Sequence, residues 1–363
     1  MIWLAYSVIG FTAIQFLVSL INLLFSEKPS PAKVNGEPPV SVLIPARNEE
    51  LNIANLLEGL QKQSYGNIEI IVFDDMSEDR TAETVLRFAE KDKRIRLIRS
   101  SGLPEGWLGK NYACHSLAMP AGGEWLLFLD ADVKISGNII KNILGFAVSE
   151  NLALVSIFPG QEMVTWGEKA TVPVMNYILL SLLPLILVRR SFFPSLAAAN
   201  GQFMFFNTKI YKKELPHKKL KANKVEDIET ARMFKRLGYR IACLTGDKTI
   251  RCRMYRGFND AVNGFSKNVA CFFGNSLLAA FLFWLITTAG FIPVLLSLPG
   301  SIFAVYVAMY VLTGIFVSAS SRQNIAGNIL YLVPRQLSLG IFIYRAFYNR
   351  IFRNYQWKGR SLK

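Results

Sequence analysis

Two carboxylates stand one residue apart directly after a short apolar run. The run is Trp125–Leu129, and Asp130 and Asp132 follow it. An apolar run of this length is typical of a fully buried β-strand. Because open α/β folds bind ligands at the carboxyl ends of their strands, we expect both acids at such an edge. There they suit a divalent cation that bridges protein and phosphate oxygens, although an acidic turn after a strand has the same sequence.

Two other motifs end predicted strands earlier in the chain. Ser41–Glu50, reading SVLIPARNEE, is predicted as a strand that enters a turn at Pro45 and Arg47, where a nucleotide would lie across the backbone. Asp74 and Asp75 follow the second predicted strand, where a carboxylate can accept the imide N–H of uracil or a ribose hydroxyl. Taken singly, this acidic pair also fits a helix N-cap.

A fourth motif opens a predicted helix further along the chain. Glu226 and Asp227 begin the segment Val225–Leu237. Acids in the first turn of a helix also complement its dipole, so this motif has a purely structural explanation as well. The last acidic residue of the chain is Asp260, and any carboxylate chemistry has to use residues up to that point.

The four motifs in this order resemble the family 2 glycosyltransferases, whose pattern is (S/V)xxIPxxNE, DDxSxD, DxD and then ED. The resemblance extends from Val40 to Leu244. It implies an α/β domain of the GT-A type (Rossmann-like) with a mostly parallel sheet. The implied reaction is the inverting transfer of a hexose, with glucose expected, from a UDP-sugar to a hydroxyl or carboxyl group of a membrane lipid acceptor such as a carotenoid.

Narrower motifs are similar to the membrane-bound branch that glucosylates hydroxylated carotenoids, the chlorobactene glucosyltransferases among them. They are GWLGKN at 106–111, NGQF at 200–203, MYRGFNDAVNGFSKN at 254–268 and WKGR at 357–360. One departure is Leu215-Pro216-His217, where the family tends to have Gly-Gly-His, which puts a role for His217 in doubt. The QxxRW motif of processive polysaccharide synthases is missing, which disfavours a polymerase.

The resemblance also implies roles for individual residues. Asp227 is the expected catalytic base, and Asp132 with Asp130 is the expected ligand pair for Mg²⁺ or Mn²⁺. The residues expected to bind the nucleotide-sugar are Pro45, Arg47, Glu49, Asp74, Lys110, Asp130 and Arg256. The residues expected on the acceptor side are Asn200, Gly201, Gln202 and Glu226.

Two of these roles have structural alternatives. Lys110 either reaches a diphosphate or is a solvated helix residue. Arg256 either clamps the pyrophosphate, as a guanidinium suits bidentate phosphate contacts, or is an interfacial cation that touches lipid.

The composition indicates a membrane protein. Hydrophobic residues make up 52% of the 363 residues, and the formal net charge is +15. With long apolar runs, this basic balance favours an anionic membrane surface over nucleic acid as the partner. The four cysteines form no CxxC pair and there are only two histidines, so a zinc site is not expected and the thiols are predicted to be reduced.

The apolar runs and the cationic segments predict the domain organisation. Residues 1–26 are a predicted transmembrane helix, since Ile2–Phe25 carries no charge, and 27–39 are a proline-containing linker. Residues 40–270 are the predicted cytoplasmic GT-A domain, with an interfacial helix near 172–188. Residues 271–344 are predicted transmembrane or interfacial helices, and 345–363 a basic cytoplasmic tail, consistent with the positive-inside rule. The protein is therefore expected in the cell membrane as a multi-pass protein.

Two membrane assignments concern the C-terminal apolar runs, and the second has an alternative. Phe272–Leu298 and Ile302–Ser318 are predicted to form a helical hairpin across the bilayer. Ile325–Tyr344 is expected to be in-plane or re-entrant, but it crosses if Arg335 faces the interior of a helix bundle.

Alternation of short apolar and amphipathic segments between Val40 and Leu244 predicts βαβ units. The predicted strands are Val40–Ile44, Ile68–Phe73, Arg96–Ile98, Trp125–Leu129, Ala153–Phe158 and Arg240–Leu244. The predicted helices are Asn52–Gln63, Thr81–Glu90, Gly109–Met119, Asn138–Ser149 and Val225–Leu237. Lys209–Lys224, which holds seven lysines, is predicted as a surface loop.

Two other functions fit the sequence. One is glycosyl transfer to a polyprenyl phosphate, which needs no general base because a phosphate acceptor has no proton to lose. The other is a non-catalytic membrane protein on a transferase fold, which the presence of all four acidic motifs weakens.

Overall fold

The computed structural model describes residues 1–29, 36–352, 356–357 and 360–361. The chain folds as two compact units that are not contiguous in sequence. The sheet unit consists of Glu27–Gly160 and Ile186–Cys252, and the helical unit consists of Met1–Ser26, Gln161–Leu185 and Arg253–Lys363. Part of the predicted linker 27–39 and most of the predicted tail beyond Phe352 lie outside the described residues.

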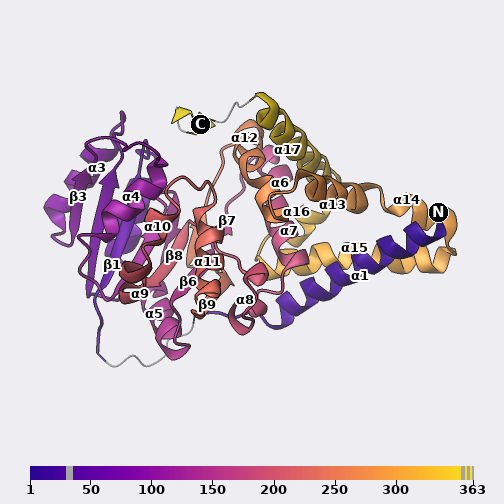
Figure 1. Ribbon diagram of the computed structural model, residues 1–363, viewed down its shortest axis with the longest axis horizontal. Helices are drawn as coiled ribbons and strands as arrows, with labels where there is room; N and C mark the ends of the chain where they lie inside the picture. The colour runs from indigo at the N-terminus through magenta and orange to yellow at the C-terminus, as the bar shows by residue number, and fades with distance from the viewer. Residues whose placement is uncertain (30–35, 353–355, 358–359, 362–363) are drawn as a thin grey trace. The chain divides into compact units, whose positions relative to one another are not determined.

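The sheet unit is built on a seven-stranded sheet in the order β3-β2-β1-β4-β8-β6-β9 (Figure 1). Its strands are β1 (Val40–Ala46), β2 (Ile68–Asp74), β3 (Ile95–Arg99), β4 (Trp125–Leu129), β6 (Leu154–Phe158), β8 (Phe203–Asn207) and β9 (Ile241–Thr245). All neighbours pair in parallel except β8, which runs antiparallel to both β4 and β6. Every residue of β4 is buried, as its apolar run predicts for a strand covered on both faces. The predicted mostly parallel α/β sheet is confirmed.

The helices of the sheet unit follow the predicted alternation. In α2, Ile53, Leu56, Leu57 and Leu60 recur at helical spacing and all are buried. These helices are α2 (Ile53–Gln61), α3 (Thr81–Lys91), α4 (Gly109–Ala118), α5 (Ile139–Ser149), α8 (Ile186–Arg190), α9 (Thr208–Glu214), α10 (Pro216–Lys219), α11 (Glu226–Arg236) and the 3₁₀ turn η1 (Pro194–Leu196).

The prediction that Lys209–Lys224 is a surface loop is wrong. This segment contains α9 and α10, which are joined at Leu215 in a left-handed conformation with φ of 47°. The Asn207 side chain accepts from Ile210 N and caps α9. Because α9 buries Tyr211 and exposes its lysines, it is an amphipathic helix, which the high lysine content of the segment does not reveal.

Short strands complete the unit beside the main sheet. β5 (Val133–Ile135) pairs antiparallel with β10 (Ile250–Cys252), and Val133 lies opposite Cys252. β7 (Gly160–Gln161) completes this second sheet. Near the C-terminus, β11 (Gln356–Trp357) pairs with β12 (Arg360–Ser361).

The helical unit contains two helices, among the described residues, that are long and apolar enough to cross a membrane: α1 (Ile2–Leu24) and α15 (Gly300–Ser320). A third span results only if a pair bent by 97°, Phe258–Phe273 and Leu277–Ala289, is counted as one broken segment. The other helices are α6 (Trp166–Thr171), α7 (Pro173–Leu182), α12 (Phe258–Asn268), η2 (Val269–Phe273), α13 (Leu277–Ala289), α14 (Phe291–Ser297), α16 (Ile325–Leu330) and α17 (Leu332–Phe352).

The first arm of the predicted hairpin, Phe272–Leu298, is not one helix. The chain bends at Gly274 and Asn275, whose φ angles are 64° and 66°, and a second break at Gly290 separates α13 from α14. A Cβ at Gly290 would lie 2.8 Å from the Val8 side chain of α1, so α1 passes close to the chain at this break. The second arm is confirmed as a helix, α15.

The predicted interfacial run 172–188 is split between the two units. Pro173 begins α7, Pro184 lies in the gap after its end, and α8 begins at Ile186. Seven of the ten α7 residues are buried within the helical unit, so α7 is a packed helix rather than an exposed amphipathic one. Its position at a membrane interface stays a prediction.

One buried side chain joins α1 to the end of α7. Asn22 Nδ2 donates to Leu180 O and Leu183 O, both at 2.9 Å, and Leu185 N donates to Asn22 Oδ1 at 2.7 Å. These bonds satisfy backbone groups that the end of α7 leaves without helical partners. A long apolar helix therefore holds a polar residue because a neighbouring helix ends against it.

We expect Asn22→Ala to lower the stability of the helical unit, since it leaves buried backbone groups unpaired at about 1–3 kcal/mol each. The melting temperature of the detergent-solubilised protein should fall clearly. Ser7→Ala on the same helix removes only a hydroxyl that bonds within α1, to Trp3 O, and is the control. Equal melting temperatures for the two variants would show that Asn22 does not link the helices.

Candidate active site

The first two sequence motifs meet at one edge of the sheet. In the parallel register of β1 and β2, Ala46 lies opposite Asp74, and Asp75 N donates to Ala46 O at 2.8 Å. Arg47 Nη1 donates to the carbonyl oxygens of Asp75 and Met76 at 2.6 and 3.1 Å. The turn that follows Pro45 is thereby fixed against the turn that follows Asp74, and both lie at the carboxyl end of the sheet.

Asp74 and Glu49 have local structural partners in these turns. Asp74 is 6% exposed, and its Oδ1 accepts from Ser77 N at 3.2 Å. Glu49 Oε2 accepts from Asn52 Nδ2 at 2.8 Å. Both carboxylates thus shape the loops that are predicted to bind the nucleotide.

The antiparallel strand β8 brings the acceptor-side motif to the same edge. Because β8 runs against β4, it begins where β4 ends, and Phe203 lies opposite Leu129. Asp130 N then donates to Gln202 O at 3.1 Å. The sequence predicted no strand here, so it did not explain why Asn200–Gln202 should lie beside Asp130.

Lys110, from the first turn of α4, lies among the acids. Its Nζ is 2.7 and 2.8 Å from the two Asp130 oxygens and 3.8 Å from Glu226 Oε1, and it donates to Gly201 O at 3.3 Å. Burial disfavours its charge, but the carboxylates of Asp130 and Glu226 outweigh burial and raise the pKa of Lys110. Lys110 is therefore not a solvated helix residue, which rules out the structural alternative.

Asp227 lies at the N-terminus of α11 with both oxygens bound by backbone donors. Oδ2 accepts from Gly201 N at 2.9 Å, and Oδ1 accepts from Ile228 N at 2.8 Å. Burial raises the pKa of Asp227, while these two N–H donors and Lys110 oppose that change. Burial also raises the pKa of Glu226, to about 7, with opposition from Lys110 and a further increase from Asp227. Two adjacent acids with raised pKa values are typical of a proton-transfer site.

The groups around Gly201 leave little room for a side chain. A Cβ at this position would lie 3.0 Å from Lys110 Nζ, 3.4 Å from Glu226 Oε1 and 3.5 Å from Asp227 Oδ2. The backbone of Gly201 can therefore donate to Asp227 and accept from Lys110 at the same time.

The flanking residues of the NGQ motif position this backbone. Asn200 N donates to Ser156 Oγ at 2.7 Å, and Asn200 Oδ1 accepts from Gln202 N at 2.8 Å. Gln202 Nε2 contacts Cys252 Sγ at 2.9 Å. Their side chains are directed into the protein fold, so their contribution to the site is the placement of Gly201.

Two features of Asp132 suit a metal ligand. Its Oδ1 is buried and has no hydrogen-bond partner in the described structure. Burial, followed by the charges of Asp130 and Glu49, raises its pKa to about 7. A cation would relieve both features, since it supplies the missing partner and stabilises the charged form.

The protein supplies few further ligands for a cation. Among the described residues, no group of three or more His, Cys, Asp or Glu side chains is arranged to hold a metal ion. A cation on Asp132 and Asp130 would take its remaining ligands from phosphate oxygens or water, as Mg²⁺ commonly does.

Two further sequence candidates have partners within their own units. Arg256 belongs to the helical unit, where its backbone N–H donates to Asp260 Oδ2 at 3.0 Å. His217 is buried, with Nδ1 2.7 Å from Tyr211 Oη, and burial lowers its pKa to about 3. His217 is a core residue. The motif at 357–360 includes residues outside the described part of the chain.

Two residues near the site were not singled out from the sequence. Asn111 Nδ2 lies within 2.8–3.2 Å of the carbonyl oxygens of Leu220, Lys221 and Asn223, which ties the segment before α11 to α4. Cys252 lies beside Asp132 because β10 pairs with β5. The GWLGKN motif contained Asn111, but only the fold shows what Asn111 binds.

Comparison with known proteins agrees with this geometry. The sequence profile described as Glycosyl transferase family 2 matches residues 41–215. These residues are therefore a family 2 glycosyltransferase domain, which confirms the resemblance seen in the four motifs.

Two curated relatives and one solved structure are informative. The chain is 28% identical over 240 residues to the 4,4'-diaponeurosporenoate glycosyltransferase of Staphylococcus haemolyticus, covering 64% of this chain and 61% of that protein. It is 25% identical over 158 residues to the beta-monoglucosyldiacylglycerol synthase of a Nostoc species, covering 43% of this chain and 33% of that protein. The chain thus spans less than two thirds of either relative.

The solved structure is a mannosyltransferase from Pyrobaculum calidifontis in complex with GDP-Man and Mn²⁺. It has a TM-score of 0.54 and 16% identity, and the match covers 96% of this chain and 99% of that chain. At this identity the likeness concerns the fold alone, and it confirms the predicted GT-A type.

The raised pKa of Glu226 gives a testable pH dependence. A folded-state pKa of about 7, above the ordinary 4.5, means that folding favours the protonated acid. This stabilisation is complete below the ordinary pKa and is lost as the pH rises through 7. As the pH rises from about 5 to 8, the melting temperature of wild-type protein should therefore fall relative to that of Glu226→Gln. Glu229→Gln on the same helix is the control and should keep the wild-type slope. Parallel slopes for all three proteins would exclude a protonated Glu226.

Proposed function

We propose that this protein is an inverting glycosyltransferase that moves a hexose from a UDP-sugar to a hydroxyl or carboxyl group of a carotenoid-like membrane lipid. The observation that carries the proposal is the Asp227 carboxylate, held by Gly201 N–H beside the Lys110–Asp130 pair. The family 2 domain supports glycosyl transfer, and the relative named for diaponeurosporenoate supports a carotenoid-like acceptor.

Asp227 would act as the general base. Its raised pKa increases its affinity for a proton, and its two backbone donors hold the carboxylate in one orientation. A fixed carboxylate within hydrogen-bond reach of an acceptor hydroxyl can remove the proton as that oxygen attacks the sugar. Glu226 supplies a second acid beside it and disfavours a negative charge on both.

The nucleotide would bind at the edge formed by the turns after β1 and β2. Asp74 would accept from uracil or ribose, and the turn containing Pro45 and Arg47 would lie against the base. Lys110 provides a cation that its own carboxylate partners keep charged. Such a cation favours the binding of an anionic diphosphate beside Asp130.

A divalent cation, Mg²⁺ or Mn²⁺, fits the same edge. Asp132 and Asp130 would hold it, and the cation would neutralise the negative charge of the departing diphosphate. The unpartnered Asp132 oxygen is the feature of this chain that supports it.

The membrane placement completes the proposal. α1 and α15 would cross the bilayer in a multi-pass protein, and the cationic sheet unit would face the cytoplasm, in keeping with the positive-inside rule. The substrate then reaches the enzyme from the membrane, and the donor reaches it from the aqueous phase.

Asp132→Ala should abolish most metal-dependent turnover, since it removes the carboxylate with the unpartnered oxygen. Titration calorimetry of UDP in the presence of Mn²⁺ should show weaker binding, while UDP binding in EDTA should match that of wild type. Asp92→Ala removes an acid that pairs with Arg94 elsewhere in the sheet unit and is the control. Full turnover of wild-type protein in excess EDTA would refute the metal assignment.

Asp227→Asn keeps the size of the side chain but cannot take a proton. With a hydroxylated acceptor, kcat should fall by about 10²–10⁴-fold, the usual contribution of a general base, while UDP affinity stays within a few fold. Glu229→Gln, whose residue pairs with Arg232 on α11, should have a much smaller effect.

The choice of acceptor separates the alternatives in the same experiment. A carboxylate or phosphate acceptor has no proton to lose, so Asp227→Asn should keep turnover with such lipids. If Asp227→Asn glycosylated a hydroxylated lipid as fast as wild type, Asp227 would not be the general base. If Asp227→Asn lost UDP binding as severely as turnover, Asp227 would be a nucleotide-site residue. If wild-type protein released no UDP with any lipid, the non-catalytic alternative would be favoured.

A further inference from the structure

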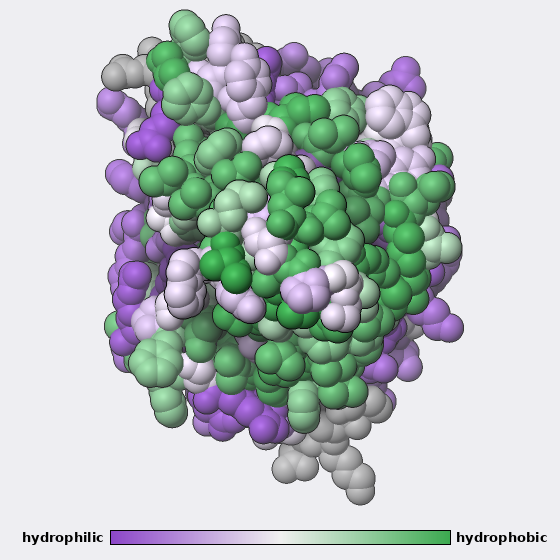
Figure 2. Space-filling view, turned by 90° about the vertical axis from the view of Figure 1, so that its right-hand side faces the viewer, coloured by the Kyte–Doolittle hydropathy of each residue, from purple (hydrophilic) through white to green (hydrophobic). Residues whose placement is uncertain are grey.

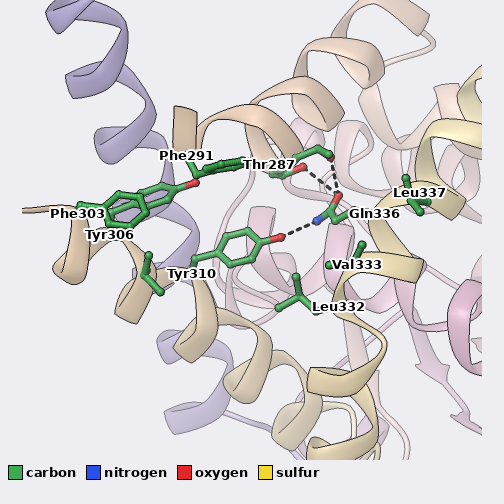
Figure 3. A pocket seen from close by; sticks show the side chains of 11 residues that line it. Thr287, Phe291, Phe303, Tyr306, Tyr310, Leu332, Val333, Gln336 and Leu337 are labelled. Carbon is green, nitrogen blue, oxygen red and sulfur yellow. Dashed lines mark hydrogen bonds between the residues drawn. The ribbon is translucent and has the colours of Figure 1, made fainter. Parts of the chain in front are cut away.

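The helical unit contains a cavity of about 400 Å³ between α13, α14, α15 and α17 (Figure 3). Its volume lies in the range of small-molecule sites, about 300–1,000 Å³. Most of the lining is apolar, and the polar groups are few. The lining residues are Thr287, Thr288, Phe291, Phe303, Tyr306, Val307, Tyr310, Leu332, Val333, Gln336 and Leu337.

One wall of the cavity is a row of aromatic rings on α15. The rings of Phe303 and Tyr306 are 6.3 Å apart at 28°, and those of Tyr306 and Tyr310 are 6.5 Å apart at 25°. The near-parallel rings follow the helix axis, because residues three and four apart lie on one face. Figure 3 shows the Phe303 and Tyr306 rings nearly superposed in projection. The row lines this wall with three rings along the helix axis.

A polar group closes one part of the cavity. Gln336 Nε2 donates to Tyr310 Oη at 3.0 Å, and Gln336 Oε1 accepts from Thr287 and Thr288 hydroxyls, both at 3.3 Å (Figure 3). Trp284 Nε1 donates to the Gln336 carbonyl at 2.9 Å and fixes the helix at this point. The hydroxyls and the amide can exchange one of their mutual bonds for a ligand oxygen.

The cavity opens on a surface suited to hydrocarbon rather than water. Of its lining residues, Val333, Leu337 and Val307 are 64%, 57% and 40% exposed. Figure 2 shows that apolar side chains cover most of the face that contains the ends of α1, α14 and α15. Since α15 has the length and hydropathy of a membrane span, its outward side chains would meet lipid chains.

We propose that this cavity binds the conjugated polyene chain of a carotenoid-class lipid, with an oxygenated end group at Gln336. The assignment rests on the proposed function and specifies how the acceptor is recognised. An extended polyene can lie along the row of rings and contact each of them. It also loses less conformational freedom on binding than a saturated acyl chain, so the same contacts give a tighter complex.

The test uses two valines on α15 that differ in position but not in chemistry. Val307 lines the cavity, whereas Val305 is 58% exposed and does not. Val307→Trp fills the cavity, and Val305→Trp places the same ring outside it. The probe is an achiral hydroxylated polyene added to the full chain in detergent, and the signal is its induced circular dichroism in the visible range.

Wild type and Val305→Trp should give the same saturable signal, and Val307→Trp should bind at least about tenfold more weakly, with an equal melting temperature. In sugar transfer, Val307→Trp should raise KM for the polyene acceptor and leave kcat and UDP affinity unchanged. Phe303→Leu, which keeps an apolar side chain but removes a ring, should weaken polyene binding too.

The possible outcomes separate this inference from the proposed function. If wild type transfers sugar and the two tryptophan variants bind the polyene equally, the cavity assignment fails and the function stands. If no transfer occurs but only Val307→Trp loses the signal, the function fails and the cavity assignment stands. Displacement of the polyene by phosphatidylglycerol at equal molar ratio would show an ordinary acyl-lipid cavity and overturn the proposal.

Discussion

The site depends on one ammonium group placed among carboxylates. Asp130, Glu226 and Asp227 come from β4 and α11, and so much like charge in a partly buried place would be unfavourable by itself. Lys110 contacts Asp130 and Glu226 directly, and its charge lowers the free-energy cost of ionising Asp227. It also lies close to Gly201, since a Cβ there would be 3.0 Å from the ammonium nitrogen and would require it to give way by a few tenths of an ångström.

Much of the sheet could be predicted from the sequence because its strands are short, apolar and separated by amphipathic segments. β8 could not, since its residues Phe203–Asn207 follow a motif that drew attention to binding, and antiparallel insertion leaves no trace in local periodicity. The first arm of the predicted hairpin was wrong as a single helix for a related reason. Hydropathy detects apolar length, but it does not register the positive φ at Gly274 or the close approach of Val8 to Gly290, where the helices break.

The candidate site could be predicted as a set of residues but not as an arrangement. The four motifs gave Asp74, Asp130, Asp132 and Asp227, and parallel strands explain why the first three share an edge. The partners of these acids were harder to predict from the sequence. For Lys110 a solvated helix position was the alternative to the diphosphate, Asn111 was not singled out within its motif, and Cys252 reaches Asp132 only through pairing of two short strands. Arg256 belongs to the helical unit, and its contact with the pyrophosphate stays a prediction.

The route of the chain between the two units has a consequence for how the protein can be made and divided. β6 and β8 are neighbours in the sheet, yet the chain between them leaves the sheet unit after Gly160 and returns at Ile186, with α6 and α7 in the helical unit. On a ribosome, Asn22 and Gln15 emerge in the first segment, but their partners at 180–185 arrive only after five strands of the sheet have been synthesised. Neither unit can therefore be completed before the other has begun. A cut that removes the C-terminal helices as a simple anchor would leave α7 without α15 and α17, so a soluble fragment of the catalytic unit would carry an exposed apolar helix in the middle of its chain.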